Sequence, residues 1–189
     1  MEKFKPWSDI IATWVTIIGV LSGGILALIQ YGDRISEERV KESLKYVDRY
    51  NSGRILDART EIEHFWDDKN RIKKLQKKQS EPELARLIVS EIDSSRAVSD
   101  DFNLVLSFYD NLRICTCARL CDMATITSFF GSEAYKLNGL FFPYIAKQRK
   151  LLNDDEIGVS LYLLATKSKN PGFAQSFCAG MQRPWTFTA

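Results

Sequence analysis

Histidine is almost missing from this chain of 189 residues, which has only His64. Four cysteines are present, and the three in "CTCARLC" lack the C-x2-C spacing of zinc ribbons. A cysteine metal site remains an alternative, but we expect no metal and interpret the cysteines as small buried thiols in a reducing compartment. The chain also has no Gly-rich phosphate loop, repeat or low-complexity linker, and we expect no cofactor.

Charge of one sign is also scarce. The formal net charge is only +2, although 26% of the residues are charged. This balance argues against a dedicated, strongly basic nucleic-acid binder, while a local basic patch stays possible. Hydrophobic residues make up 45% of the chain, enough for one domain with a sizeable core, or for one domain with an appendage.

One long segment has no charge at all. Residues 10–32, "IIATWVTIIGVLSGGILALIQYG", match the roughly 20 residues that cross a bilayer as a helix. Trp7, Trp14 and Tyr31 lie near its ends, where aromatic side chains favour the membrane interface. We predict a transmembrane helix; the alternatives are a buried core helix and a cleaved signal peptide.

Flanking charges predict the orientation of this helix. Lys3 and Lys5 precede it, and a larger set of basic residues follows within about 20 positions. That set is Arg34, Arg39, Lys41, Lys45 and Arg49. The excess predicts a short periplasmic tail at residues 1–9 and a cytoplasmic domain at residues 33–189, anchored in a bacterial inner membrane.

The predicted span has one unusual face. At about 100° per residue, its small and polar side chains fall within a sector of roughly 80°. They include Thr16, Gly19, Gly23, Ala27 and Gln30, with Gly19 and Gly23 forming a GxxxG pair. A neighbouring helix or a water-filled lumen favours such a face, whereas lipid does not. We predict a homo-oligomer, packed or arranged around a pore; the alternative is a monomeric anchor.

The remainder predicts helices only. Apolar residues recur at helical spacing, and no strand alternation stands out. The expected helices cover residues 34–50, 53–78, 81–92, 101–120, 123–130, 132–152 and 155–169. Ser80, Ser99 or Asp100, and Asp122 are candidate N-caps, Gly131 should close one helix, and Pro143 should kink or break another. The segment after Pro171 is expected to dock onto the body.

Two runs carry a resemblance to a known family. "NLVLSFYDNLRICTCARLCDMATITSFFG" and "FFPYIAKQR" resemble small bacterial membrane-anchored helical proteins. One branch of them is the membrane accessory protein of type VI-B CRISPR systems, which has a divergent HEPN-type Arg-x4–6-His motif. The resemblance implies an all-α, HEPN-like bundle and an oligomeric pore that assists RNA-triggered antiphage defence. Its implied partners are the RNA-guided effector or its RNA.

Arg59 and His64 would form that motif in "ARTEIEHF". In HEPN ribonucleases the imidazole acts in acid–base chemistry and the arginine stabilises phosphate charge. Residues five apart differ by about 140° around the helix axis, so Arg59 and His64 share a face only if the helix is distorted or each residue meets a partner chain. Glu61 and Glu63 would also repel a phosphate, so the alternative is an Arg59–Glu63 ion pair and a structural His64.

The densest basic run is "KNRIKKLQKK" at residues 69–78. Lys73, Lys74, Lys77 and Lys78 are candidate contacts to RNA phosphates or anionic lipid. The alternative is a solvated helix end. No aromatic residue interleaves the run, so base stacking has little support.

These observations predict a membrane-embedded, homo-oligomeric pore with a helical domain and the lipid bilayer as its surroundings. Enzymatic activity is not expected. The rival hypotheses are a membrane-tethered, metal-independent HEPN-like ribonuclease that uses Arg59 and His64, and a scaffold without catalytic activity.

Overall fold

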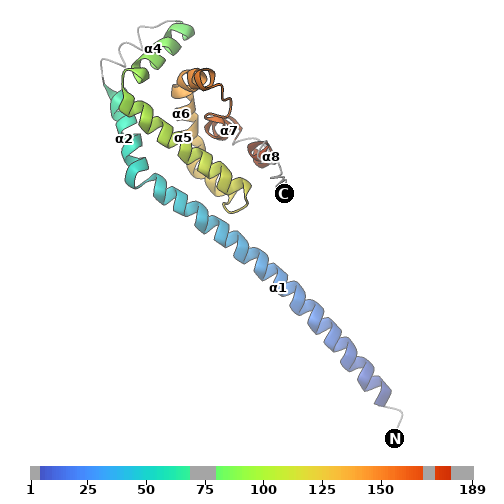
Figure 1. The fold of residues 1–189 in the computed structure, drawn as a ribbon. Helices are drawn as coiled ribbons and strands as arrows, with labels where there is room; N and C mark the ends of the chain where they lie inside the picture. Colours follow the sequence, from blue (N-terminus) through green and yellow to red (C-terminus); the bar gives the residue numbers. More distant parts are fainter. Residues whose placement is uncertain (1–4, 69–79, 168–172, 180–189) are drawn as a thin grey trace, which may run out of the picture. The chain divides into compact units, whose positions relative to one another are not determined.

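The computed structural model describes residues 5–68, 80–167 and 173–179 (Figure 1). Every regular element in these ranges is an α-helix, as the sequence predicts. The helices are α1 (Lys5–Tyr50), α2 (Gly53–Asp67), α4 (Glu81–Asp93), α5 (Arg96–Cys117), α6 (Met123–Leu152), α7 (Val159–Lys167) and α8 (Phe173–Cys178).

The chain divides into two compact units, Met1–Arg39 and Val40–Ala189. The first unit holds most of α1, which is long and apolar enough to cross a membrane. Every residue from Trp14 to Arg34 is exposed, including large apolar side chains such as Leu28 and Val20. This segment therefore does not form a buried core helix, because no other part of the described structure covers its apolar side chains.

The second unit is a helical body built around α5 and α6. Helix α5 packs against α2, α4, α7 and α8, and α6 packs against α4 and α7. Its core is rich in aromatic rings: Phe102 stacks on Phe141 at a centroid distance of 3.9 Å. The last turns of α1 belong to this body. The ring centroid of Tyr50 lies 5.0 Å from that of Phe108 and 5.1 Å from that of Phe130.

Helix ends follow local capping chemistry. Asp122 begins α6 as predicted, and its Oδ2 accepts hydrogen bonds from the Thr125 backbone N–H at 2.7 Å and hydroxyl at 2.8 Å. Ser80 precedes α4, with Pro82 in the first turn. Helix α5 begins earlier than predicted, because Ser95 supplies the cap and accepts from the Val98 N–H.

The prediction that Gly131 closes a helix is wrong, because α6 runs unbroken from Met123 to Leu152. Pro143 does not break α6 either, and the kink predicted there as the other outcome stays a prediction. A buried apolar stripe continues at helical spacing through both positions, from Phe130 through Phe141 to Tyr144, and packing outweighs the local cost of these residues. Pro143 leaves the carbonyl of Gly139 without its helical donor, and Gly139 is exposed to solvent.

Candidate functional site

The small-residue face of α1 is the first candidate site. Thr16, Gly19, Gly23, Ala27 and Gln30 are all exposed. A Cβ placed on Gly19 or Gly23 would meet no atom within 4 Å. The Ser22 hydroxyl donates to the Gly19 carbonyl at 3.1 Å, which satisfies a polar group inside the apolar segment. The face therefore offers room for close approach of another helix.

The side chain of Arg59 contacts residues of two other helices. Its guanidinium lies 4.0 Å from the centroid of the Tyr50 ring. Nη1 donates to the Tyr50 carbonyl at 3.4 Å, and Nη2 lies 3.7 Å from Oε1 of Glu133. The predicted local alternative, a pair with Glu63, is replaced by this tertiary contact with α6. Arg59 therefore ties α2 to the end of α1 and to α6.

His64 does not join Arg59 in this cluster. The imidazole belongs to an exposed residue of α2, while the Arg59 side chain is only 17% exposed and faces Tyr50 and Glu133. Among the described residues, no hydrogen bond or ion pair involves His64. The small cavity beside Arg59, about 190 Å³, is lined by Glu63, Glu133 and Lys136 together with apolar side chains, and not by His64.

Two buried tyrosines complete the Arg59 cluster. The hydroxyl groups of Tyr50 and Tyr109 lie 3.3 Å apart. Burial raises the pKa of Tyr50 to about 12, against the opposing effects of the hydrogen bond with Tyr109 and the Arg59 charge. Burial also raises the pKa of Tyr109, and the neighbouring Tyr50 adds to this effect. Both phenols stay neutral at physiological pH, so neither tyrosine is ready to act as a base.

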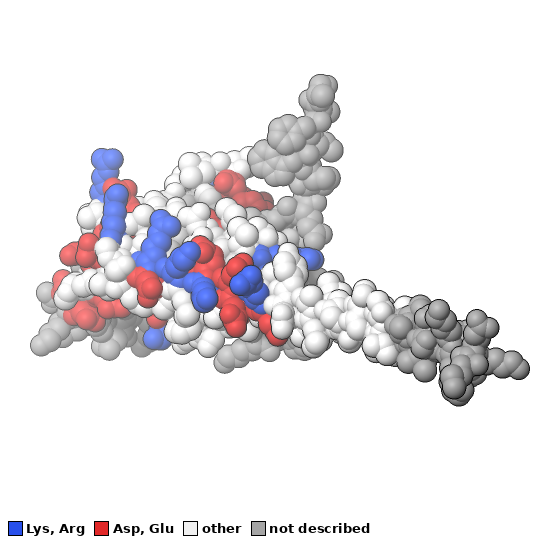
Figure 2. All heavy atoms as spheres, turned by 90° about the horizontal axis from the view of Figure 1, so that it is seen from below, with Lys and Arg blue, Asp and Glu red and all other residues white. Residues whose placement is uncertain are grey.

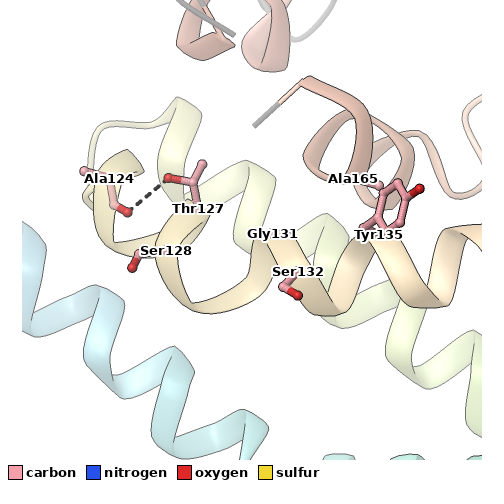
Figure 3. Close-up of a pocket in the computed structure, with 7 residues that line it drawn as sticks. All are labelled: Ala124, Thr127, Ser128, Gly131, Ser132, Tyr135 and Ala165. Carbon is pink, nitrogen blue, oxygen red and sulfur yellow. Dashed lines mark hydrogen bonds between the residues drawn. The ribbon is translucent and has the colours of Figure 1, made fainter. Parts of the chain in front are cut away.

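A larger cavity of about 460 Å³ lies between α6 and α7 (Figure 3). Consecutive turns of α6 supply most of its lining, and Ala165 of α7 lies beside Tyr135. The residues are Ala124, Thr127, Ser128, Gly131, Ser132, Tyr135 and Ala165. The Thr127 hydroxyl donates back to the Ala124 carbonyl at 3.0 Å. The part of the lining that the structure describes has hydroxyl groups and small apolar side chains.

The body presents no surface of a single charge sign on the face in Figure 2, where basic and acidic side chains are interleaved. Lys73, Lys74, Lys77 and Lys78 lie outside the described residues. Within the described ranges, no group of three or more metal-ligating side chains could hold an ion.

The prediction of free thiols is wrong. Cys115 bonds to Cys121, and Cys117 bonds to Cys178. The first bond closes the turn after α5, where Arg119 has a left-handed backbone with φ of 59°. The second joins α5 to α8, and so confirms that part of the segment after Pro171 docks onto the body. Spacing along the chain could not reveal this pair, because 61 residues separate its members.

Arg113 holds the same segment without covalent bonds. Its Nε donates to the Phe177 carbonyl at 2.8 Å, and Nη2 donates to the Ala179 carbonyl at 2.9 Å. Nη1 also lies 3.7 Å from the exposed carboxylate of Glu156. Burial raises the pKa of nearby Asp110, although a hydrogen bond with Ser160 and the charge of Arg113 both lower it. The sequence offered no signal for Arg113, whose partners are backbone carbonyls far along the chain.

Comparison with known proteins gives a family and no activity. No curated protein and no solved structure matches the chain. Residues 17–168 match a family described as a domain of unknown function, DUF4760. This match takes in most of the small-residue face of α1 and the Arg59 cluster. The chain belongs to the DUF4760 family.

Proposed function

We propose that the chain is a membrane-anchored protein that assembles through the small-residue face of α1 and forms a pore in the bilayer. One observation carries the proposal: Thr16, Gly19, Gly23, Ala27 and Gln30 share one sector of an exposed, apolar helix. Leu, Ile and Val side chains lie mostly on the remaining surface and suit lipid. With one candidate span in the described chain, the helix that packs on this sector comes from another copy.

The polar members of the face favour a pore over a dry bundle. Gln30 carries four hydrogen-bonding sites that an acyl environment cannot satisfy. In a ring of copies this side chain can meet water or its own counterpart. Ion leakage through such an opening is the mechanism we propose, and the helical body is the part that would control it. Assistance to a type VI-B CRISPR effector in antiphage defence is implied by the resemblance alone and stays a prediction.

The ribonuclease alternative receives less support. Arg59 is engaged by Tyr50 and Glu133, while His64 is exposed and outside the cavity beside Arg59. A HEPN-type site needs both side chains at one phosphate. The arrangement supports the structural alternative for Arg59.

A leucine at Gly23 tests the proposal. Gly23→Leu places a bulky side chain in the centre of the face, and Gly32→Leu makes the same change roughly 180° away around the helix. Both glycines have open space around them in a single copy, so neither change should disturb the protomer. We expect Gly23→Leu to lower the mass of the detergent-solubilised assembly and abolish ion leakage from liposomes, while Gly32→Leu retains both. Unchanged assembly and leakage in Gly23→Leu would refute the proposed interface.

Two further substitutions separate a pore from a passive scaffold. Thr16→Val and Gln30→Met keep side-chain size while removing polarity. If both side chains line a water-filled lumen, these substitutions should leave the mass of the assembly unchanged and reduce ion leakage at least severalfold. A wild-type assembly that forms but never leaks ions would support self-association and exclude the pore.

A further inference from the structure

All four cysteines of the chain are used in two disulfides of the helical body. In each pair the Cα atoms lie 5.3 Å apart. Cys115 and Cys121 are 5% and 4% exposed, so these two sulfurs are packed into the core. Complete pairing of every cysteine is typical of proteins that fold in an oxidising compartment.

Contacts that involve no sulfur already bring each pair together. The N–H groups of Leu120 and Cys121 donate to the Cys115 carbonyl at 3.0 and 3.2 Å, which turns the chain back toward α5. The hydrogen bonds from Arg113 to the carbonyls of Phe177 and Ala179 hold the residues on both sides of Cys178. Phe177 is also only 1% exposed. The fold itself therefore presents Cys121 to Cys115 and Cys178 to Cys117. Exchange with the disulfide of a thiol–disulfide oxidoreductase then completes each bond, and the two electrons and two protons of each pair pass to that enzyme, which leaves as a dithiol.

The pairing and the flanking charges predict opposite sides of the membrane. Disulfides are rare in the cytosol, where thioredoxin and glutathione keep thiols reduced. The excess of Lys and Arg after the span predicts a cytosolic body, but this rule weakens for segments longer than about 60 residues, which translocate largely regardless of charge. Residues 33–189 form such a long segment. The two disulfides are the more specific signal, because they involve every cysteine and two separate parts of the fold.

We infer that the helical body lies on the oxidising, non-cytosolic side of the membrane, with residues 1–9 in the cytosol. The inference uses the membrane anchor of the proposed function but not its self-association. It has a direct consequence for partners. A cytosolic RNA-guided effector and its RNA could not reach the body, so ligands that control the assembly would be components of the periplasm or the extracellular space.

Thiol counting in intact cells tests this inference. The full chain is produced in a Gram-negative host, and the cells are quenched with acid so that free thiols can be blocked. Cysteines that escape blocking are then labelled with a maleimide polymer, in one sample without reduction and in a second sample after reduction. We expect no label before reduction of the sample and four labels per chain after it. Unpaired thiols in the freshly quenched wild-type protein would overturn the inference.

Matched variants check which cysteines form each pair. Cys178→Ser should leave one free thiol, that of Cys117, which is blocked at quench, so that two labels follow reduction. The double variant Cys117→Ser with Cys178→Ser should also give two labels, with no thiol available to the blocking reagent. Equal blocking in both variants would contradict the Cys117–Cys178 pair and with it the inference.

Protease treatment of spheroplasts gives a readout of the same inference that does not depend on sulfur. We expect added trypsin to digest the body of the wild-type chain while a cytosolic marker protein survives. Full protection of the body would overturn the inference. Alkaline extraction of the membranes tests the anchor separately: release of the chain would refute the anchor of the proposed function, while the thiol count would still report the compartment.

Discussion

The guanidinium of Arg59 lies over the ring of Tyr50, with 4.0 Å between Cζ and the ring centroid. This contact joins two helices that a tight turn separates, and Glu133 of α6 adds a 3.7 Å ion pair. Arg59 Nε is buried and has no hydrogen-bond partner among the described residues. Packing over the aromatic face therefore adds to the hydrogen bond and the ion pair that hold Arg59.

Arg59→Ala should lower the free energy of unfolding of the body by about 2 kcal/mol, because it removes the cation–π contact and the partner of Glu133. His64→Ala changes an exposed side chain five residues away and should stay within about 0.5 kcal/mol of the wild type. Chemical denaturation followed by tryptophan fluorescence in detergent measures both. A larger loss in His64→Ala than in Arg59→Ala would contradict the structural role of Arg59.

RNA incubated with the purified protein should remain intact. Arg59 is engaged by Tyr50 and Glu133, and among the described residues His64 does not line the cavity beside it, so wild type, Arg59→Ala and His64→Ala should show the same background. Labelled RNA on a denaturing gel provides the measurement. Metal-independent cleavage by the wild type that disappears in His64→Ala would restore the ribonuclease hypothesis.

Alkaline pH should destabilise the body through its buried tyrosines. The pKa of Tyr50 is about 12 in the folded chain against an ordinary value of 10.0, so the folded state retains a proton that the unfolded chain loses. This contribution, about 3 kcal/mol, is fully present below pH 10 and is lost as the pH rises through 12. Tyr109 acts in the same direction.

Unfolding midpoints measured across this alkaline range should therefore fall, with a shallower fall in Tyr50→Phe. That variant keeps the ring beneath Arg59 and removes the hydroxyl. Tyr135→Phe makes the same chemical change at a side chain that is 69% exposed, and should leave the pH dependence as in the wild type. An identical slope in Tyr50→Phe and wild type would contradict the assignment.

The two disulfides should contribute unequally to stability. In the loop-entropy account, a bond that spans 61 residues stabilises by about 4 kcal/mol, and one that spans 6 residues by about 2 kcal/mol. Replacing Cys117 and Cys178 with serine should thus lower the free energy of unfolding more than replacing Cys115 and Cys121. Denaturant titrations of the two double variants measure the difference, and a reversed order would show that local strain or packing dominates.

Two glycines should respond to alanine with opposite signs. Gly158 has φ of +69°, and a Cβ there would lie 3.1 Å from the Ile145 side chain, so Gly158→Ala should destabilise by about 1–3 kcal/mol. Gly139 lies in α6 with open space around it, and Gly139→Ala should stabilise by about 0.5–1 kcal/mol. Thermal unfolding of both variants provides the check.

Local chemistry in the sequence was enough to predict the helical class, the apolar α1 segment and the cap at Asp122. Each depends on residues within a few positions of one another. The misses involve distant partners. Gly131 and Pro143 would end an isolated helix, but the stripe through Phe130 and Phe141 meets the rest of the core and extends α6 across both.

The candidate site was harder to predict for the same reason. The Arg59–Glu133 and Cys117–Cys178 pairs join residues that lie far apart in the chain. Spacing suggested the nearer partners Glu63 and His64 for Arg59, and it offered no partner at all for Cys178. The small-residue face of α1 is different, because helix periodicity alone defines it, and its role in assembly stays a prediction.

The bond between Cys117 and Cys178 has a consequence for biogenesis. A ribosome must add 61 residues after Cys117 to complete the pair, so α5 is synthesised well before its covalent link to α8 is possible. During that interval the Cys117 thiol must not form a disulfide with another cysteine, while the nearby Cys115 already has its partner Cys121 within reach. The disulfide that fixes α8 to the core therefore forms late in the maturation of each newly made chain.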